Sequence, residues 1–443
     1  MNQTDKACDL AIGQDEVTPV AAGKFNLDEI MNCMQCGFCL PACPTYRQTG
    51  LESHSPRGRI ALMKGVAQAQ LPADAEFAKN MYACLGCRAC ETACPAGVSY
   101  GSLLETAREV VEDQNKKTAK PSLLRRLVFE HVFPHPNRMK ALGTVLWAVQ
   151  ALGLQRLATR TGWARVLPRA LAEMQQAVEP VASPFIRGKR QQRMRAEGES
   201  LYTVGYFTGC VMDVLFFETN QATARLLAKA GCEVVFVGGQ TCCGALHAHA
   251  GEKAWAVELA KRNIEAFEQS QVDFIVNSAG GCGAALKEYP HWFEDDPGWQ
   301  KRAEAFAAKV RDASELLAAL PPLSFTKELS ARVTYQDSCH LAHGQGVRDQ
   351  PRQLLNLIPG VEVVELEQAD QCCGSAGIYN ITHFDQSMEI LDAKMEAVKK
   401  TDAHFIAISN PGCLLQMRQG IIRAGLTGKM EAVHLMDLLD RAL

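Results

Sequence analysis

The chain has 443 residues, of which 47% are hydrophobic and 21% charged, and its formal net charge is −3. This composition is typical of a globular protein of about three domains, and the weakly negative balance disfavours a nucleic-acid partner. No stretch reaches the roughly 18 uncharged apolar residues of a membrane span, and residues 1–24 lack the basic start and apolar run of a signal peptide. The eighteen cysteines therefore indicate reduced, metal-loaded thiols in the cytoplasm.

Eight of these cysteines lie in two copies of one motif, C-x2-C-x2-C-x3-C-P. The first copy runs from Cys33 to Pro44 and the second from Cys84 to Pro95. This spacing is typical of two-cluster ferredoxins, in which three thiolates of one copy bind a [4Fe–4S] cluster and the fourth binds the other. We therefore predict one cluster on Cys33, Cys36, Cys39 and Cys94 and a second on Cys84, Cys87, Cys90 and Cys43. Two zinc sites are the alternative, although zinc usually takes C-x2-C pairs separated by a longer loop.

The segments around the two motifs predict helices rather than strands. Residues 25–31 form a short predicted helix, and a longer one begins at Pro56 and extends to about residue 70. Residues 99–113 place apolar side chains at helical spacing. We expect residues 1–24 to be a loosely docked leader and residues 25–120 to form a helical, ferredoxin-like domain with two clusters.

Residues 121–200 differ in charge from the rest of the chain. They contain thirteen Lys or Arg residues and five acidic ones, together with the apolar residues Leu142, Val145, Leu146, Trp147, Leu152 and Leu154. Basic helices with Trp and Leu often lie on anionic lipid. We predict a basic helical linker that contacts either the membrane surface or a partner protein of the same complex.

From residue 201 the chain alternates between strands and helices, and the pattern repeats once. The first unit, 201–290, has predicted strands at 202–207, 233–237 and 273–277 and helices at 216–230 and 252–268. The second unit, 332–443, has strands at 332–336, 362–366 and 404–409 and helices at 350–357 and 384–400, and residues 291–331 connect the two. Alternation of this kind predicts parallel sheets with right-handed crossovers. The expected fold class is therefore α+β and multidomain, with two duplicated α/β units.

Each predicted strand of a unit is followed by a cysteine, and one strand of each unit by Cys-Cys-Gly. The carboxyl ends of parallel strands meet at one edge of a sheet, where open α/β sheets bind ligands. We therefore predict a further cluster in one or both units, on Cys210, Cys242, Cys243 and Cys282 and on Cys339, Cys372, Cys373 and Cys413. Gly244 and Gly374 are expected to let the backbone approach the cofactor. Cysteines that only pack as small hydrophobes, or that bind zinc, are the alternatives.

Nucleotide-binding signals are missing from the sequence. It has no phosphate loop and no G-x-G-x-x-G after a strand, so we expect neither flavin nor NAD on this chain. His247, His249, His340 and His343 flank cysteine positions and are either cluster-tuning residues or ordinary loop residues.

Taken together, these motifs carry a resemblance to a known family. The paired ferredoxin motifs, Pro56-Arg57-Gly58-Arg59 between them and the two Cys-Cys-Gly repeats resemble the iron–sulfur subunit of bacterial glycolate oxidase. More distant relatives are the iron–sulfur subunits of anaerobic glycerol-3-phosphate dehydrogenase and of lactate utilisation, and the Cys-Cys-Gly repeat protein of heterodisulfide reductase. Ala279 and Asn410 stand where each repeat of that reductase has a fifth cysteine, which disfavours its disulfide-reducing chemistry here.

The resemblance implies an electron-transfer subunit of a glycolate or 2-hydroxy acid dehydrogenase complex. Separate FAD-containing subunits would oxidise the acid, and this chain alone would not. It would pass electrons towards a quinone from a position on the inner face of the cytoplasmic membrane. A catalytic disulfide-type reductase, or the iron–sulfur subunit of a lactate or glycerol-3-phosphate dehydrogenase, are the alternative functions.

Overall fold

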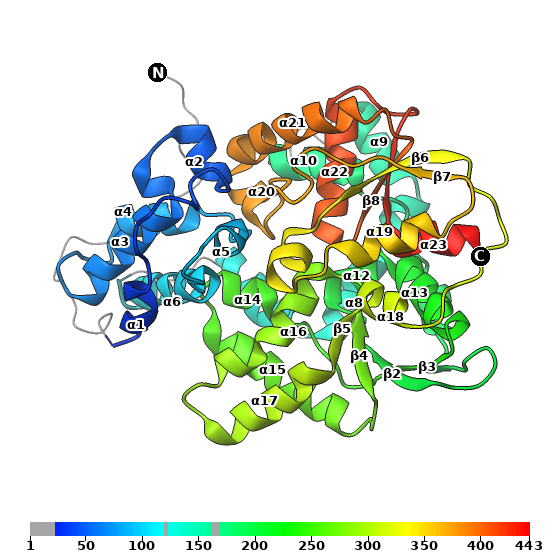
Figure 1. Ribbon diagram of the computed structural model, residues 1–443, viewed down its shortest axis with the longest axis horizontal. Coiled ribbons are helices and arrows are strands. Elements are labelled where there is room, and N and C mark those ends of the chain that lie inside the picture. The colour runs from blue at the N-terminus through cyan, green and yellow to red at the C-terminus, as the bar shows by residue number, and fades with distance from the viewer. Residues whose placement is uncertain (1–22, 119–122, 162–167) are drawn as a thin grey trace.

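A computed structural model of the chain describes residues 23–118, 123–161 and 168–443. Most of the expected leader, residues 1–22, lies outside the described residues. Lys24, the last residue of the expected leader, forms ion pairs with Glu109 and Asp113 at 2.6 and 2.5 Å. In Figure 1 the N-terminal domain lies at one side of the molecule, against the two α/β units.

The N-terminal domain is helical, and no strand occurs within residues 23–118. Its elements are α1 (Leu27–Met31), α2 (Pro44–Thr49), η2 (Glu52–His54), α3 (Pro56–Ala67), α4 (Ala75–Tyr82), α5 (Ala89–Thr92) and α6 (Tyr100–Thr118). Helix α3 begins as predicted at Pro56, where a missing N–H costs nothing, and the hydroxyl of Ser55 accepts a hydrogen bond from the Gly58 N–H at 3.0 Å. Met63, Met81 and Val111 pack in the core between α3, α4 and α6.

The linker region is mostly helical where it is described. It contains α7 (Leu123–Arg126), the π-helical η3 (Leu127–Val132), α8 (Pro136–Ala151), α9 (Leu154–Thr161), α10 (Arg169–Ala177) and α11 (Pro184–Gly188). No helix in the described ranges is long and apolar enough to span a bilayer.

The first α/β unit is built on a five-stranded sheet in the order β1-β3-β2-β4-β5. Its strands are β1 (Arg193–Met194), β2 (Tyr202–Tyr206), β3 (Cys232–Phe236), β4 (Phe274–Asn277) and β5 (Val310–Asp312). All pairings are parallel except that of β1 with β3. The helices are α12 (Cys210–Leu215), α13 (Phe217–Lys229), α14 (Ala245–His249), α15 (Lys253–Glu268), α16 (Gly280–Trp292), α17 (Pro297–Lys309) and α18 (Ala313–Ala319).

The second unit repeats this order in a four-stranded parallel sheet, β7-β6-β8-β9. Its strands are β6 (Ala331–Gln336), β7 (Val361–Val363), β8 (Phe405–Ile408) and β9 (Glu431–His434). The helices are η5 (His340–Gly344), α19 (Asp349–Asn356), α20 (Tyr379–Thr382), α21 (Phe384–Lys400), α22 (Pro411–Arg423) and α23 (Leu435–Ala442). The parallel sheets and the duplication agree with the sequence prediction.

Three short strands were not predicted, and they extend both sheets. Strand β5 comes from the expected connector, β1 from the end of the linker and β9 from the C-terminal region. No cysteine closely follows any of these three strands, unlike the predicted strands of each unit, so only the sheet itself reveals them. The two units also share one core, in which Val204 and Leu227 of the first unit belong to the same cluster as Tyr335 and Leu438 of the second.

Candidate metal centres

The first candidate centre is a cavity in the N-terminal domain. Its lining includes Cys33, Cys36, Cys39 and Cys94, and Cys90 also reaches its wall. It lies near the surface, since Cys36 is exposed and the neighbouring Met34 and Phe38 are each 68% exposed. Three cysteines of the first motif and the last cysteine of the second thus lie around one space.

The second cavity lies deeper in the same domain. Cys43, Cys84, Cys87 and Cys90 line it, and all four are buried. Here the last cysteine of the first motif joins three cysteines of the second motif. This crossed arrangement is the one that the ferredoxin-type pairing requires.

Helix α3 begins between the two cavities. Pro56 and Tyr100 line both of them, while Arg57 lines the first and Arg59 the second. The N-terminus of a helix carries partial positive charge, so this helix places positive charge beside both groups of thiols. Tyr100 adds a hydroxyl that lies 3.6 Å from the Cys84 sulfur.

Arg59 is fully buried at the second cavity. Its guanidinium donates to the carbonyls of His54 and Asn80 at 2.7 and 2.8 Å and to the Thr45 hydroxyl at 3.2 Å. Burial alone would raise the pKa of Cys84, but the positive charges of Arg59 and Arg108 outweigh it and hold this pKa below its ordinary value. The protein thus stabilises a thiolate at this position. The sequence showed Arg59 only as part of a family motif and did not predict this role.

In the first α/β unit the four predicted cysteines come together at the carboxyl edge of the sheet. The sulfurs of Cys210 and Cys242 are 3.5 Å apart, and the neighbouring Cys242 thiol and burial raise the pKa of Cys210. Cys243 interacts with both Cys242 and Cys282. Asn263 fixes the Cys-Cys pair, because its side chain donates to the Cys242 carbonyl at 2.9 Å.

The second unit assembles Cys339, Cys372, Cys373 and Cys413 in the same way. Cys372 interacts with Cys339 and Cys373, and Cys373 with Cys413. The neighbouring Cys372 thiol and His340 hold the pKa of Cys339 well below its usual range, against the opposing effect of burial. The Gly374 N–H also points to the Cys372 sulfur at 3.4 Å.

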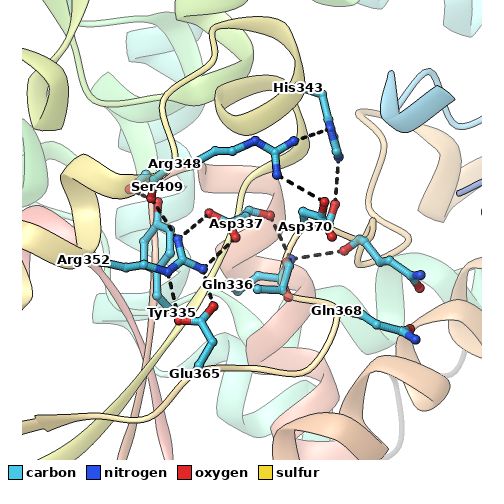
Figure 2. Close-up of polar contacts among 12 residues, drawn as sticks. Tyr335, Gln336, Asp337, His343, Arg348, Arg352, Glu365, Gln368, Asp370 and Ser409 are labelled. Carbon is cyan, nitrogen blue, oxygen red and sulfur yellow. Dashed lines mark hydrogen bonds and ion pairs between the residues drawn. The ribbon is translucent and has the colours of Figure 1, made fainter. Parts of the chain in front are cut away.

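A polar network holds the turns that carry these cysteines, and Figure 2 shows most of its members. Arg352 reaches both Asp337 and Glu365, and Arg348 reaches Asp370 and His343. Gln336, at the end of β6, donates to the carbonyls of Ala369 and Gln371 at 2.9 and 3.2 Å. The turn before Cys339 is thereby tied to the loop before Cys372.

The two cysteine groups of the α/β units meet at the interface between the units. Cys282 of the first unit packs in the same apolar cluster as Cys373 and Cys413 of the second. Asn410 lies at this junction: its oxygen accepts from the Gly281 N–H at 3.1 Å, and its nitrogen lies 3.4 Å from the Cys413 sulfur. The residue in place of the fifth cysteine therefore donates to a thiol.

The N-terminal domain also reaches the second unit through cysteines. Leu85, Cys87 and Ala89 share one small apolar cluster with Cys339 and Cys372. The thiols of the second ferredoxin-type cavity thus lie beside those of the second α/β unit. This neighbourhood could not be seen in the sequence, in which Cys87 and Cys339 are far apart.

Among the four flanking histidines, His340 is the one that contacts a predicted site thiol, with its Nδ1 3.5 Å from the Cys339 sulfur. His247 pairs with the Phe129 carbonyl at 2.8 Å, His249 with Glu105 at 2.8 Å and His343 with the Asp370 carbonyl at 3.0 Å. Those three histidines contact carbonyl or carboxylate oxygens rather than a site thiol.

Gly244 and Gly374 have φ angles of +84° and +91°, which favour glycine. A Cβ atom on Gly374 would lie 2.6 Å from the Ser387 carbonyl oxygen, and one on Gly244 would lie 3.1 Å from the Trp292 ring. Packing inside the protein is therefore one reason for these glycines. Their predicted approach to a cofactor stays a prediction.

The donor sets fit iron–sulfur clusters. Each of the four groups consists of cysteine thiols, the ligands of such clusters, and the arginines beside Cys84 favour its thiolate. Among the described residues, no group of three or more His, Cys, Asp or Glu side chains is arranged around a position for a single metal ion.

Comparison with known proteins follows the same division of the chain. Residues 29–98 match the 4Fe-4S dicluster domain, and residues 204–287 and 333–418 each match the cysteine-rich domain. Residues 120–178 match the linker region of the glycolate oxidase iron–sulfur subunit.

Two relatives that match over most of the chain are also named as glycolate oxidase iron–sulfur subunits. The chain is 49% identical over 417 residues to the probable glycolate oxidase iron–sulfur subunit of Bacillus subtilis, covering 94% of each chain. It is 30% identical over 426 residues to the glycolate oxidase iron–sulfur subunit of Escherichia coli, covering 95% of this chain and 96% of the relative. The chain belongs to the family of glycolate oxidase iron–sulfur subunits.

This membership confirms the family resemblance found in the sequence. Lactate utilization protein A of Geobacillus kaustophilus is a shorter relative, 34% identical over 238 residues, which are 54% of this chain and 98% of the relative. The dicluster and cysteine-rich matches support an iron–sulfur subunit that transfers electrons. The matches to this family therefore cover the N-terminal domain, the linker and both α/β units.

Proposed function

We propose that this chain is the electron-transfer subunit of a glycolate or related 2-hydroxy acid dehydrogenase complex. It takes electrons from FAD-containing subunits, which oxidise the acid, and passes them towards a quinone. The observation that carries the proposal is the pair of neighbouring cavities, the first lined by five cysteines and the second by four, in each case drawn from both motifs. The glycolate oxidase subunits among its relatives supply the substrate class.

The proposal assigns ligands to two [4Fe–4S] clusters. Cys33, Cys36, Cys39 and Cys94 hold the first, and Cys84, Cys87, Cys90 and Cys43 hold the second. Such clusters supply one-electron transfer, with potentials that depend on net charge, hydrogen bonds and exposure. Arg59, Arg108 and the Tyr100 hydroxyl provide charge and hydrogen bonds at the second position, whereas the first lies close to solvent. The division of the chain into domains at residues 25–120, 121–200, 201–290 and 332–443 is part of this proposal.

Replacement of Cys43 by Ser tests the crossed ligation. The variant should perturb the EPR signal of the cluster bound by Cys84, Cys87 and Cys90, because Cys43 lies in their cavity. Cys94→Ser is the matched variant and should perturb the other signal. Damage by Cys43→Ser that is confined to the cluster of Cys33, Cys36 and Cys39 would contradict the assignment.

We also propose that one or both α/β units hold a further iron–sulfur cluster. Four thiols kept together in a crevice without a metal would be prone to oxidation, and here the arrangement occurs twice. Iron analysis of anaerobically purified protein tests this. About eight irons per chain would mean that both units are empty, whereas about twelve or sixteen irons would mean one or two filled units.

The division of labour within the complex has its own test. The isolated chain, free of flavin, should not oxidise glycolate, whereas the complex with its flavoprotein subunits should reduce the clusters when glycolate is added. Glycolate turnover by the isolated chain would overturn the proposed electron-transfer role.

A further inference from the structure

A cavity of about 430 Å³ lies between the linker and the first α/β unit. Phe133, Pro136 and Met139 form its wall on the linker side, and Val214, Phe236 and Val237 form much of the wall on the other side. Its volume is in the range of small-molecule sites, which are mostly apolar with a few polar groups. Neither cavity of the N-terminal domain includes these residues.

The cavity ends at the cysteines of the first unit. Cys210 and Cys242 line it, whereas Cys243 and Cys282 do not. Cys242 is 1% exposed, and its sulfur lies 3.5 Å from that of Cys210. A molecule in the cavity would therefore lie beside Cys210 and Cys242 of the four-thiol group.

The lining favours a flat aromatic molecule with polar oxygen atoms. Phe133 and Phe236 contribute aromatic rings, and the chain segment Gly238–Gly239 leaves backbone without side chains along the wall. The guanidinium of Arg190 is paired with Asp213 and lies 5.1 Å from the centre of the Phe236 ring. Lys140 also lines the cavity and is exposed, so its ammonium can donate a hydrogen bond to a ligand oxygen.

Helix α8 connects the cavity with an exposed apolar surface. Its first turn supplies Pro136, Met139 and Lys140 to the cavity, and one to two turns later Leu142 and Val145 are 50% and 61% exposed. A ligand that partitions into lipid would find both the surface and the cavity on the same helix.

We propose that this cavity binds the headgroup of a quinone, next to the cysteines of the first α/β unit. The inference rests on the proposed function and gives its electron acceptor a place on this chain. Reduction of one quinone to the quinol takes two electrons and two protons. Oxidation of one 2-hydroxy acid to the 2-oxo acid by the complex releases the same number of each.

Gly238 offers a way to fill the cavity. Gly238 lines the cavity, and a Cβ atom on it would meet no atom within 4 Å, so a Phe side chain can be accommodated at this position. Gly298, in α17, does not line the cavity, and its Cβ would meet only the Asp296 side chain at 3.6 Å. Gly298→Phe is therefore the matched control, and Met139→Trp fills the same cavity from the linker side.

The experiment measures binding of decylubiquinone to the anaerobically purified full chain by titration calorimetry, with iron content determined for each variant. We expect saturable binding by the wild type and by Gly298→Phe, and at least a tenfold loss of affinity in Gly238→Phe or Met139→Trp at unchanged iron content. Full affinity in a filled variant that keeps its iron, or no binding by the wild type, would overturn the proposal.

Two further readouts separate this inference from the proposed function. Displacement of decylubiquinone by glycolate would contradict the ligand class, since the cavity would then prefer the anion. If glycolate still reduces the clusters in the complex while the isolated chain binds no quinone, the electron-transfer role stands and only the cavity assignment fails.

Discussion

Arg59 illustrates how a single residue couples the fold to the proposed chemistry. A fully buried guanidinium costs several kcal/mol unless it is paired, and here its neighbours are carbonyls, a hydroxyl and the thiols of Cys43 and Cys84. Its charge therefore both favours and requires negative charge at the second cavity. Arg57, at the first cavity, is instead partly solvated and paired with Glu52 at 2.8 Å.

Replacement of Arg59 by Met should make the reduction potential of the second cluster more negative. Loss of a nearby positive charge disfavours the added electron, and a change of about 60 mV corresponds to a tenfold change in the equilibrium constant. Redox titration followed by EPR measures the shift. Arg57→Met is the matched variant and should act on the first cluster instead. An unchanged or more positive potential of the second cluster in Arg59→Met would contradict the role of this charge.

At the scale of the element, helix α3 positions both N-terminal cavities. Its first turn approaches the preceding 3-10 turn closely, because a Cβ atom on Gly58 would lie 1.9 Å from the Glu52 carbonyl oxygen. No side chain can be accommodated there without moving backbone. The close approach places Pro56 and its neighbouring arginines at the cavity walls.

Replacement of Gly58 by Ala should therefore displace the start of α3 and lower the iron content of the N-terminal domain. Gly65→Ala in the same helix is the control, since its Cβ would meet the flexible Leu71 side chain at 2.6 Å, which can move. Iron analysis and the EPR signals of both variants measure the effect. Equal iron content in the two variants would show that the start of α3 tolerates displacement.

At the scale of the whole molecule, one buried histidine joins the two α/β units. His434 of the second unit is fully buried; its Nε2–H donates to the Ser278 carbonyl of the first unit at 2.8 Å, and its Nδ1 accepts from the Met436 N–H at 3.2 Å. Burial lowers the pKa of His434 to about 4, with Arg418 adding to the shift. The neutral ring is therefore the one that the folded state accepts.

Lowering the pH should reduce the stability of the folded protein through protonation of His434. Because the pKa is lower in the folded than in the unfolded state, the stability contributed by His434 is present above about pH 6.5 and is lost as the pH falls towards 4. Between pH 7 and pH 5 the loss is about 2 kcal/mol. Urea unfolding of wild type and His434→Gln at both pH values measures it. The difference in unfolding free energy between the wild type and His434→Gln should shrink at pH 5. A difference that is constant with pH would refute the coupling between protonation of His434 and stability.

The linker presents an apolar and basic surface that we expect to bind an anionic membrane. Leu142 and Val145 are exposed on α8, and basic residues near such a surface contribute about 1 kcal/mol each. Flotation with anionic liposomes should recover the chain at low salt and less of it at high salt, because salt screens these charges. Val145→Glu should weaken recovery, whereas Leu357→Glu, at an exposed position of the second unit, should not. Binding indifferent to salt and to anionic lipid would leave contact with a partner protein of the complex as the role of this surface.

The family, the two ferredoxin-type motifs, the helical N-terminal domain and the parallel α/β duplication were all predictable from the sequence. These features depend on local spacing: three cysteines within a few residues, strands followed by a cysteine, and apolar residues at helical intervals. Predicted helix 384–400 coincides with α21, because a long periodic segment shows its own boundaries. Strands β1, β5 and β9 were missed, since no cysteine closely follows them and their pairing is visible only in the sheets.

Which groups lie together became visible only in the folded chain. Cys87 and Cys339 share an apolar cluster, Asn410 contacts both units, and the linker closes one side of the cavity at Cys210 and Cys242. The effect of the Arg59 charge on the Cys84 thiol likewise required the structure, because it depends on burial and on the distance between the two residues rather than on the place of Arg59 in the motif. Contacts between residues hundreds of positions apart arise from packing of whole elements, which local spacing does not encode.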